Sequence, residues 1–223
     1  MYRLDVTDEN SINQAITESI KDFGKIDVII NNAGYGLMGA FELASKEKIQ
    51  SQYDTNLFGV MNVTRAILPH FRQNKAGLFI NVSSVGGRIT TPYTSLYQSS
   101  KFALEGFSES LGYELKQFGI KVKIVEPGVV FTDFMSALQM TNDDSIKDYD
   151  EEIKKIPEAI SKMISSGNGS TPESIAETLY AAASDGTDKI RYVSGKDGEQ
   201  MLAMKKELGD EGYFKMMCEQ FLG

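Results

Sequence analysis

The stretch at residues 78–101 limits most strongly what this 223-residue chain can fold into. Its first five residues, 78–82, form a short apolar run of the kind found in buried parallel strands. The run ends at Ser83 and Ser84, and two glycines follow directly. We therefore expect both serines at the carboxyl end of a strand, where its loop begins.

A tyrosine and a lysine follow this strand at helical spacing. Tyr97 and Lys101 are four residues apart, and the apolar residues after them recur as one face of a helix over residues 94–118: Phe102, Leu104, Phe107 and Leu111. Both side chains should leave the same face. Because a nearby cation favours a phenolate, we expect Lys101 to lower the pKa of Tyr97 from about 10 by roughly 1 to 3 units.

The hydroxyl of Ser84 completes a chemical set with this pair. It could donate a hydrogen bond to the same substrate oxygen that exchanges a proton with Tyr97, and so stabilise charge that develops there. A phenol, an ammonium and a hydroxyl that converge on one oxygen suit the interconversion of carbonyls and alcohols.

Strand and helix patterns alternate along the rest of the chain. We expect the end of a strand at residues 2–6 and helices and strands in turn after it: a helix from Thr7 or Asp8 to Gly24, a strand at 26–31, helices in two pieces over 45–71, a strand at 121–126, a helix at 172–183, a strand at 190–193 and a helix at 198–221. This rhythm predicts an α/β fold with a doubly wound parallel sheet.

One glycine motif matches a dinucleotide fingerprint only in letters. Gly34, Gly36 and Gly39 give G-Y-G-L-M-G, but the next helical pattern begins only near Ser45, and the next strand ends at serines instead of an acidic residue. We therefore interpret these residues as a permissive loop.

Composition excludes several other functions. The formal net charge of -8 offers no general attraction to nucleic acid, and no apolar run reaches the roughly 18 residues of a membrane span. With one cysteine, Cys218, and one histidine, His70, a disulfide, a metal site or a Ser-His-Asp triad is not expected. We predict a single cytoplasmic domain over residues 1–223.

Five motifs resemble the short-chain dehydrogenase/reductase family, in the family's order: N-N-A-G at residues 31–34, N-L-F-G at 56–59, Ser84, Y-x-x-x-K from Tyr97 to Lys101, and P-G-V-V-F-T at 127–132. The resemblance covers nearly the whole chain. It implies a Rossmann-like fold, NADP or NAD as cofactor with NADP favoured, a small-molecule carbonyl or alcohol substrate, and assembly as a homodimer or homotetramer.

The resemblance also implies roles for individual residues. Tyr97 would be the general acid/base, Lys101 would depress its pKa and bind the nicotinamide ribose, Ser84 would polarise the substrate oxygen, and Asn56 would order a relay water. Besides Tyr97 and Lys101, the implied cofactor contacts are Asp5, Val6, Asn32, Ala33, Gly34, Pro127, Gly128, Val130 and Thr132.

Residues 134–171 have weak periodicity, which is typical of a lid or a long loop. Their position resembles the family's substrate-covering segment. We expect Phe134, Met135 and Leu138 to line an apolar substrate pocket together with Ser84 and Tyr97.

The resemblance further implies a missing start. Family members begin with a strand and a glycine-rich turn that receives the pyrophosphate, and about 50 such residues would precede this sequence. We therefore expect a Rossmann-like sheet without its first strands, poor affinity for cofactor, and an exposed edge at the 26–31 strand, covered either by residues 2–6 or by another chain. An alternative function, a non-catalytic module that keeps only the fold and its oligomer contacts, stays open.

Overall fold

The computed structural model describes residues 1–130, 134, 136–156 and 169–221. Its centre is a four-stranded sheet in the order β1 (Val28–Asn31), β3 (Gly77–Val82), β4 (Ile120–Pro127), β6 (Arg191–Ser194). All three strand pairings are parallel. The registers align Asn31 with Asn81 and Val82 with Val125, so the carboxyl ends of β1, β3 and β4 meet at one edge of the sheet.

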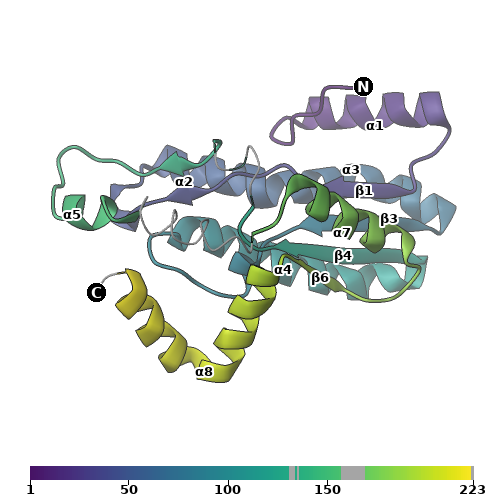
Figure 1. Ribbon diagram of the computed structural model, residues 1–223. Helices are drawn as coiled ribbons and strands as arrows, with labels where there is room; N and C mark the ends of the chain where they lie inside the picture. Colours follow the sequence, from purple (N-terminus) through teal and green to yellow (C-terminus); the bar gives the residue numbers. More distant parts are fainter. Residues whose placement is uncertain (131–133, 135, 157–168, 222–223) are drawn as a thin grey trace.

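Helices cover both faces of this sheet (Figure 1). On one face α3 (Gly59–Asn74) and α4 (Ser95–Leu115) pack on β3 and β4 around Phe71 and Phe79, and α1 (Glu9–Phe23) joins the same apolar cluster through Ile12. On the other face α7 (Pro172–Ser184) packs through Ala182. The predicted doubly wound α/β architecture is confirmed.

The predicted helix boundaries hold closely. Asp8 caps α1 by accepting a hydrogen bond from the Asn10 N–H, and Gly24 ends the helix with φ +80°. Ser45 caps α2 (Lys46–Tyr53). The two helical pieces expected over 45–71 are joined by a π-helical turn, η2 (Asp54–Phe58), which the spacing alone did not predict.

The expectation of a strand at residues 2–6 is wrong. Asp5 accepts hydrogen bonds from both the backbone N–H and the hydroxyl of Thr7, and the N–H of Asp5 donates to Ser11 Oγ, so the chain turns into α1 instead of extending. Residues 2–6 therefore do not cover β1, which forms one edge of the sheet. Ile30 on this strand is 46% exposed.

Two charged residues of β4 lie in the interior. Lys123 is buried and donates to the carbonyl of Ala182 and to Asp185, at 2.8 and 2.6 Å. Glu126 is buried and pairs with Arg88 and Arg191. β4 is thus a central strand whose buried charges are paired.

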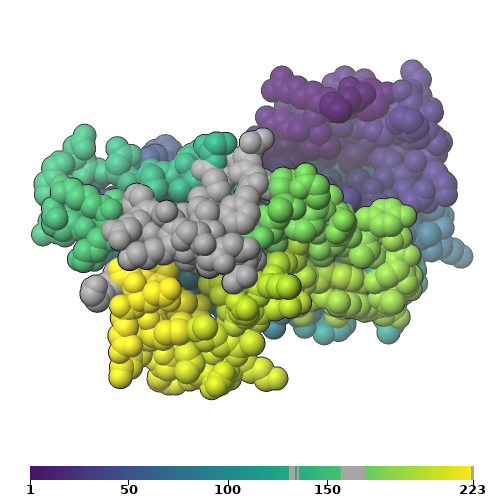
Figure 2. Space-filling view, in the orientation of Figure 1, coloured from purple at the N-terminus to yellow at the C-terminus, as the bar shows by residue number. Residues whose placement is uncertain are grey.

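Two short strands, a short helix and the long last helix lie outside the central sheet. The G-Y-G-L-M-G loop forms a strand, β2 (Leu37–Met38), that pairs with β5 (Gln139–Met140). A short 3-10 turn, η1 (Phe41–Leu43), follows it, and the next α-helix, α2, begins only at Lys46, as the sequence predicts. A short helix, α5 (Asp150–Ile153), lies in the expected lid. The last helix, α8 (Lys196–Phe221), bends at Gly209 (Figure 1). Its second half packs through Tyr213 and Met217 against Val85 and Ile89, and α8 forms the yellow lower part of the molecule in Figure 2. Within the described residues, no helix combines the length and apolar character that crossing a membrane requires.

Candidate active site

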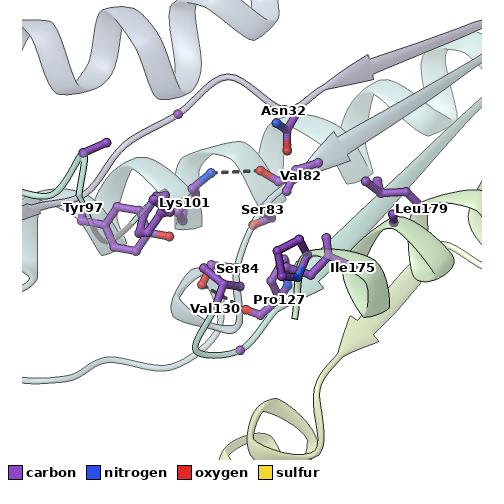
Figure 3. Close-up of a pocket in the computed structure, with 16 residues that line it drawn as sticks. Asn32, Val82, Ser83, Ser84, Tyr97, Lys101, Pro127, Val130, Ile175 and Leu179 are labelled. Carbon is purple, nitrogen blue, oxygen red and sulfur yellow. Dashed lines mark hydrogen bonds between the residues drawn. The ribbon is translucent and has the colours of Figure 1, made fainter. Parts of the chain in front are cut away.

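A cavity of about 750 Å³ opens at the sheet edge where β1, β3 and β4 end (Figure 3). Most of the residues predicted to act in catalysis and cofactor binding line it: Asn32, Gly34, Ser84, Tyr97, Lys101, Pro127, Gly128 and Val130. In parallel α/β sheets, ligands bind beyond the carboxyl ends of the strands. Segments that are distant in sequence therefore meet at the expected place.

Tyr97, Lys101 and Ser84 share this cavity. Lys101 Nζ lies 5.9 Å from the centroid of the Tyr97 ring, as expected for residues one helical turn apart on α4. The ammonium donates to the carbonyl of Val82 at 2.9 Å, which anchors it at the end of β3. Ser84 is the second residue after β3 and caps the short turn η3 (Val85–Gly87), because its Oγ accepts from the Gly86 N–H.

Burial controls the protonation of the pair and reverses one prediction. It raises the pKa of Tyr97 above its ordinary value, while a hydrogen bond with Ser84 acts in the opposite direction. Burial also lowers the pKa of Lys101 to about 8, although the negative charge of Glu105 acts to raise it. The expected fall in the pKa of Tyr97 is therefore wrong for the protein alone, because loss of solvent outweighs the hydrogen bond with Ser84.

Asn56 lies behind the cavity wall and does not line it. Its side chain is 1% exposed and holds the backbone of Tyr35 from both sides, since Oδ1 accepts from the N–H and Nδ2 donates to the carbonyl. Nδ2 also lies 3.2 Å from Ser100 Oγ on α4. Asn56 sits in η2, and π-helical turns of this kind are frequent at functional sites.

Gly34 lies between Asn56 and Lys101, where the space for a side chain is narrow. A Cβ atom at this position would lie 3.2 Å from Asn56 Oδ1 and 3.6 Å from Lys101 Nζ. The absent side chain lets the loop after β1 approach both groups, which explains why this position of the N-N-A-G motif is a glycine.

Not every predicted site residue lines the cavity. Asp5 is engaged with Thr7, Val6 packs against Gly59, and Ala33 is exposed outside the cavity. Leu138 contacts the loop at Gly36. Thr132 and Met135 lie outside the described residues.

Sequence reasoning missed the wall formed by α7. This helix presents apolar side chains to the cavity at helical spacing: Ile175, Ala176 and Leu179. Their spacing was a usable signal for one helical face, but nothing local showed which cavity that face borders. Val82, Ser83, Ala137 and Pro172 also line the cavity.

The residues present suit the nicotinamide end of a dinucleotide. Beside a phenol and an ammonium, the cavity offers the carboxamide of Asn32, the backbone at Gly34 and the turn after β4. The described residues hold no cluster of His, Cys, Asp or Glu arranged to bind a metal ion. The phenol, the ammonium, the carboxamide and the backbone groups of this cavity fit an organic cofactor bound by hydrogen bonds and backbone contacts.

Comparison with known proteins agrees with this geometry. Residues 1–143 match the family model for short chain dehydrogenases. An uncharacterized oxidoreductase of Schizosaccharomyces pombe is 36% identical over 208 residues, which cover 93% of this chain and 86% of that protein. The 3-ketodihydrosphingosine reductase of Bacteroides thetaiotaomicron is 40% identical over 182 residues, covering 80% of this chain and 66% of that protein.

A solved structure with a bound cofactor has a similar fold. ElxO with NADP bound matches with a TM-score of 0.70 and 28% identity, covering 86% of this chain and 75% of that one. Together with the family match and the site geometry, this likeness identifies the chain as a member of the short-chain dehydrogenase/reductase family of nicotinamide-dependent oxidoreductases.

Proposed function

We propose that this protein transfers a hydride between NADP(H) and an apolar carbonyl or secondary alcohol. The observation that carries the proposal is the convergence of Ser84, Tyr97 and Lys101 on one cavity, beside the turn at residues 127–130. The nicotinamide would supply or accept the hydride at the substrate carbon. The side chains of this chain would handle the oxygen and its proton.

In the reduction direction, the phenol of Tyr97 would donate its proton to the carbonyl oxygen as the hydride reaches the carbon. Burial keeps the phenol protonated before the reaction, which suits a proton donor. The hydroxyl of Ser84 would donate a hydrogen bond to the same oxygen. The charged form of Lys101 would favour the phenolate left on Tyr97 and bind the nicotinamide ribose.

Asn56 would support Ser84, Tyr97 and Lys101 from behind the cavity wall. Because its side chain is occupied by the Tyr35 backbone and Ser100, we propose that it fixes the loop after β1 and the start of α4 relative to each other. The backbone of the π-helical turn that carries Asn56 would then hold the water that returns a proton to Lys101.

The cavity walls favour an apolar substrate. The ring of Phe134 lies 5.9 Å from that of Tyr97, and α7 adds Ile175 and Leu179. Phe134 also reaches the loop at Gly36. The reduction of 3-ketodihydrosphingosine, after which the Bacteroides relative is named, is consistent with such walls.

The resemblance extends the proposal to cofactor and assembly. We propose NADP over NAD, in line with the cofactor bound in ElxO, with Asn32, Gly34, Pro127, Gly128 and Val130 on its nicotinamide half. We further propose that residues 1–223 act as one unit in a cytoplasmic homodimer or homotetramer.

A binding titration tests the function directly. The protein is titrated with NADPH and with NADH, followed by cofactor fluorescence, and then assayed with ketones of increasing apolar size. We expect weak but saturable binding, with NADPH tighter than NADH, and turnover that improves with the apolar size of the ketone. A folded protein that binds neither cofactor would contradict the proposal and favour the non-catalytic module.

A further inference from the structure

We propose that Asp197, near the start of α8, is a positioning residue that fixes the turn at residues 127–130 against the cavity. Asp197 Oδ2 accepts a hydrogen bond from the Val129 N–H at 2.6 Å. The inference rests on the proposed function only where it concerns cofactor affinity. The hydrogen bond between Val129 and Asp197 does not depend on that function.

The turn is held at each successive residue. The carbonyl of Pro127 accepts from Ser84 Oγ at 3.3 Å, and the Gly128 N–H donates to the carbonyl of Ser194 at 2.9 Å. Val129 is held at both backbone groups, because its carbonyl accepts from the Ser170 N–H at 2.8 Å while its N–H donates to Asp197. Among these four bonds, only the one to Asp197 involves a charged side chain.

Two glycines make room for this carboxylate. A Cβ at Gly128 would lie 2.4 Å from Asp197 Oδ2, and a Cβ at Gly195 would lie 2.5 Å from Oδ1. Gly195 also has φ +99°, a conformation that side chains disfavour. The backbone on both sides of the carboxylate is therefore shaped to admit it.

The helix that carries Asp197 also packs against the catalytic side of the site. A Cβ at Gly198 would lie 2.9 Å from Val85 Cγ1, directly after Ser84, and 3.4 Å from the Cα of Gly128. The first turn of α8 thus touches both the turn that carries Ser84 and the turn at residues 127–130. A negative charge is also favourable at a helix N-terminus.

Two substitutions separate the hydrogen bond from the charge. Asp197→Ala removes the acceptor, whereas Asp197→Asn keeps a side-chain oxygen at the same place. Glu199→Gln is the matched control, because Glu199 is an exposed acid in the same first turn of α8. It removes one charge from the helix N-terminus without touching the turn.

The primary readout is amide hydrogen exchange at Val129, measured by NMR without cofactor. Loss of a hydrogen bond to a charged group should raise exchange at Val129 about tenfold or more in Asp197→Ala. We expect Asp197→Asn to restore part of the protection and Glu199→Gln to leave it unchanged. NADPH should bind about tenfold more weakly to Asp197→Ala, with KM for the cofactor rising more than kcat falls.

Unchanged exchange at Val129 in Asp197→Ala would overturn the proposal. So would a rise spread evenly over β6 and α8, since this would show a general structural role, or an equal effect of Glu199→Gln. If the unaltered protein bound no NADPH, the proposed function would fail, while the exchange comparison would still decide whether Asp197 holds the turn.

Discussion

At the scale of single residues, the catalytic set was predictable because its members sit at short, regular spacings. Tyr97 and Lys101 are one helical turn apart, and Ser84 marks the end of an apolar strand. Their protonation was not predictable in the same way. The pKa of Tyr97 depends on how much solvent the folded chain removes, and that quantity comes from segments far away in sequence.

Lys101 provides a test of this burial through stability. Its pKa in the folded protein is about 8, whereas in the unfolded chain it should be near 10.5, so between these values the unfolded state binds the extra proton. The free energy of unfolding of the unaltered protein should therefore rise with pH in this window, whereas that of Lys101→Met lacks this contribution. We expect the free energy of unfolding of the unaltered protein minus that of Lys101→Met to increase by about 2 kcal/mol between pH 7.5 and 9.5.

Urea denaturation of both proteins across this pH range measures the difference. A difference that stays constant would show that Lys101 keeps an ordinary pKa in the folded state. A difference that shrinks with rising pH would show that the folded protein raises its pKa.

At the scale of elements, the sequence predicted helices and parallel strands well, since capping residues and apolar periodicity are local. Asp8, Ser45 and Thr171 each cap the helix that follows them. The strand expected at residues 2–6 was wrong because Asp5 forms a turn with Thr7. The π-helical turn at Asn56 was missed because one extra residue in a helix leaves no clear pattern.

The edge strand β1 carries a prediction about association. Its outer edge is unpaired in the described part of the chain, and Ile30 on it is exposed. Because open apolar edges are templates for pairing with another chain, we expect self-association that grows with protein concentration. Ile30→Lys should weaken it, since charges on edge strands oppose such pairing.

Sedimentation analysis over a range of concentrations measures this association. Phe23→Lys is the control, because Phe23 is 77% exposed on α1 and is not part of β1. A protein that stays monomeric at every concentration, or an equal effect of both substitutions, would contradict a role for the β1 edge.

At the scale of the whole molecule, the cavity depends on packing that no local pattern reveals. The order of motifs identified the residues from β1, β3, α4 and β4, and the fold brings them to one edge of the sheet. The contributions of α7 and of Asp197 could not be predicted. They depend on which face of a later helix packs over an earlier turn, and this is decided only by the folded chain.

The central claim is that Tyr97 gives the proton in a hydride transfer, and one substitution tests it most directly. Tyr97→Phe removes only the phenolic oxygen. Tyr113→Phe is a matched control on the same helix, since Tyr113 is 71% exposed. We expect Tyr97→Phe to lower kcat for NADPH-dependent ketone reduction by about 10²-fold or more while NADPH still binds, and Tyr113→Phe to change neither.

The measurement is the ratio of kcat for the two variants, with the NADPH dissociation constant taken alongside. A large loss confined to Tyr97→Phe is the result predicted here. Equal turnover by Tyr97→Phe and Tyr113→Phe would contradict the account.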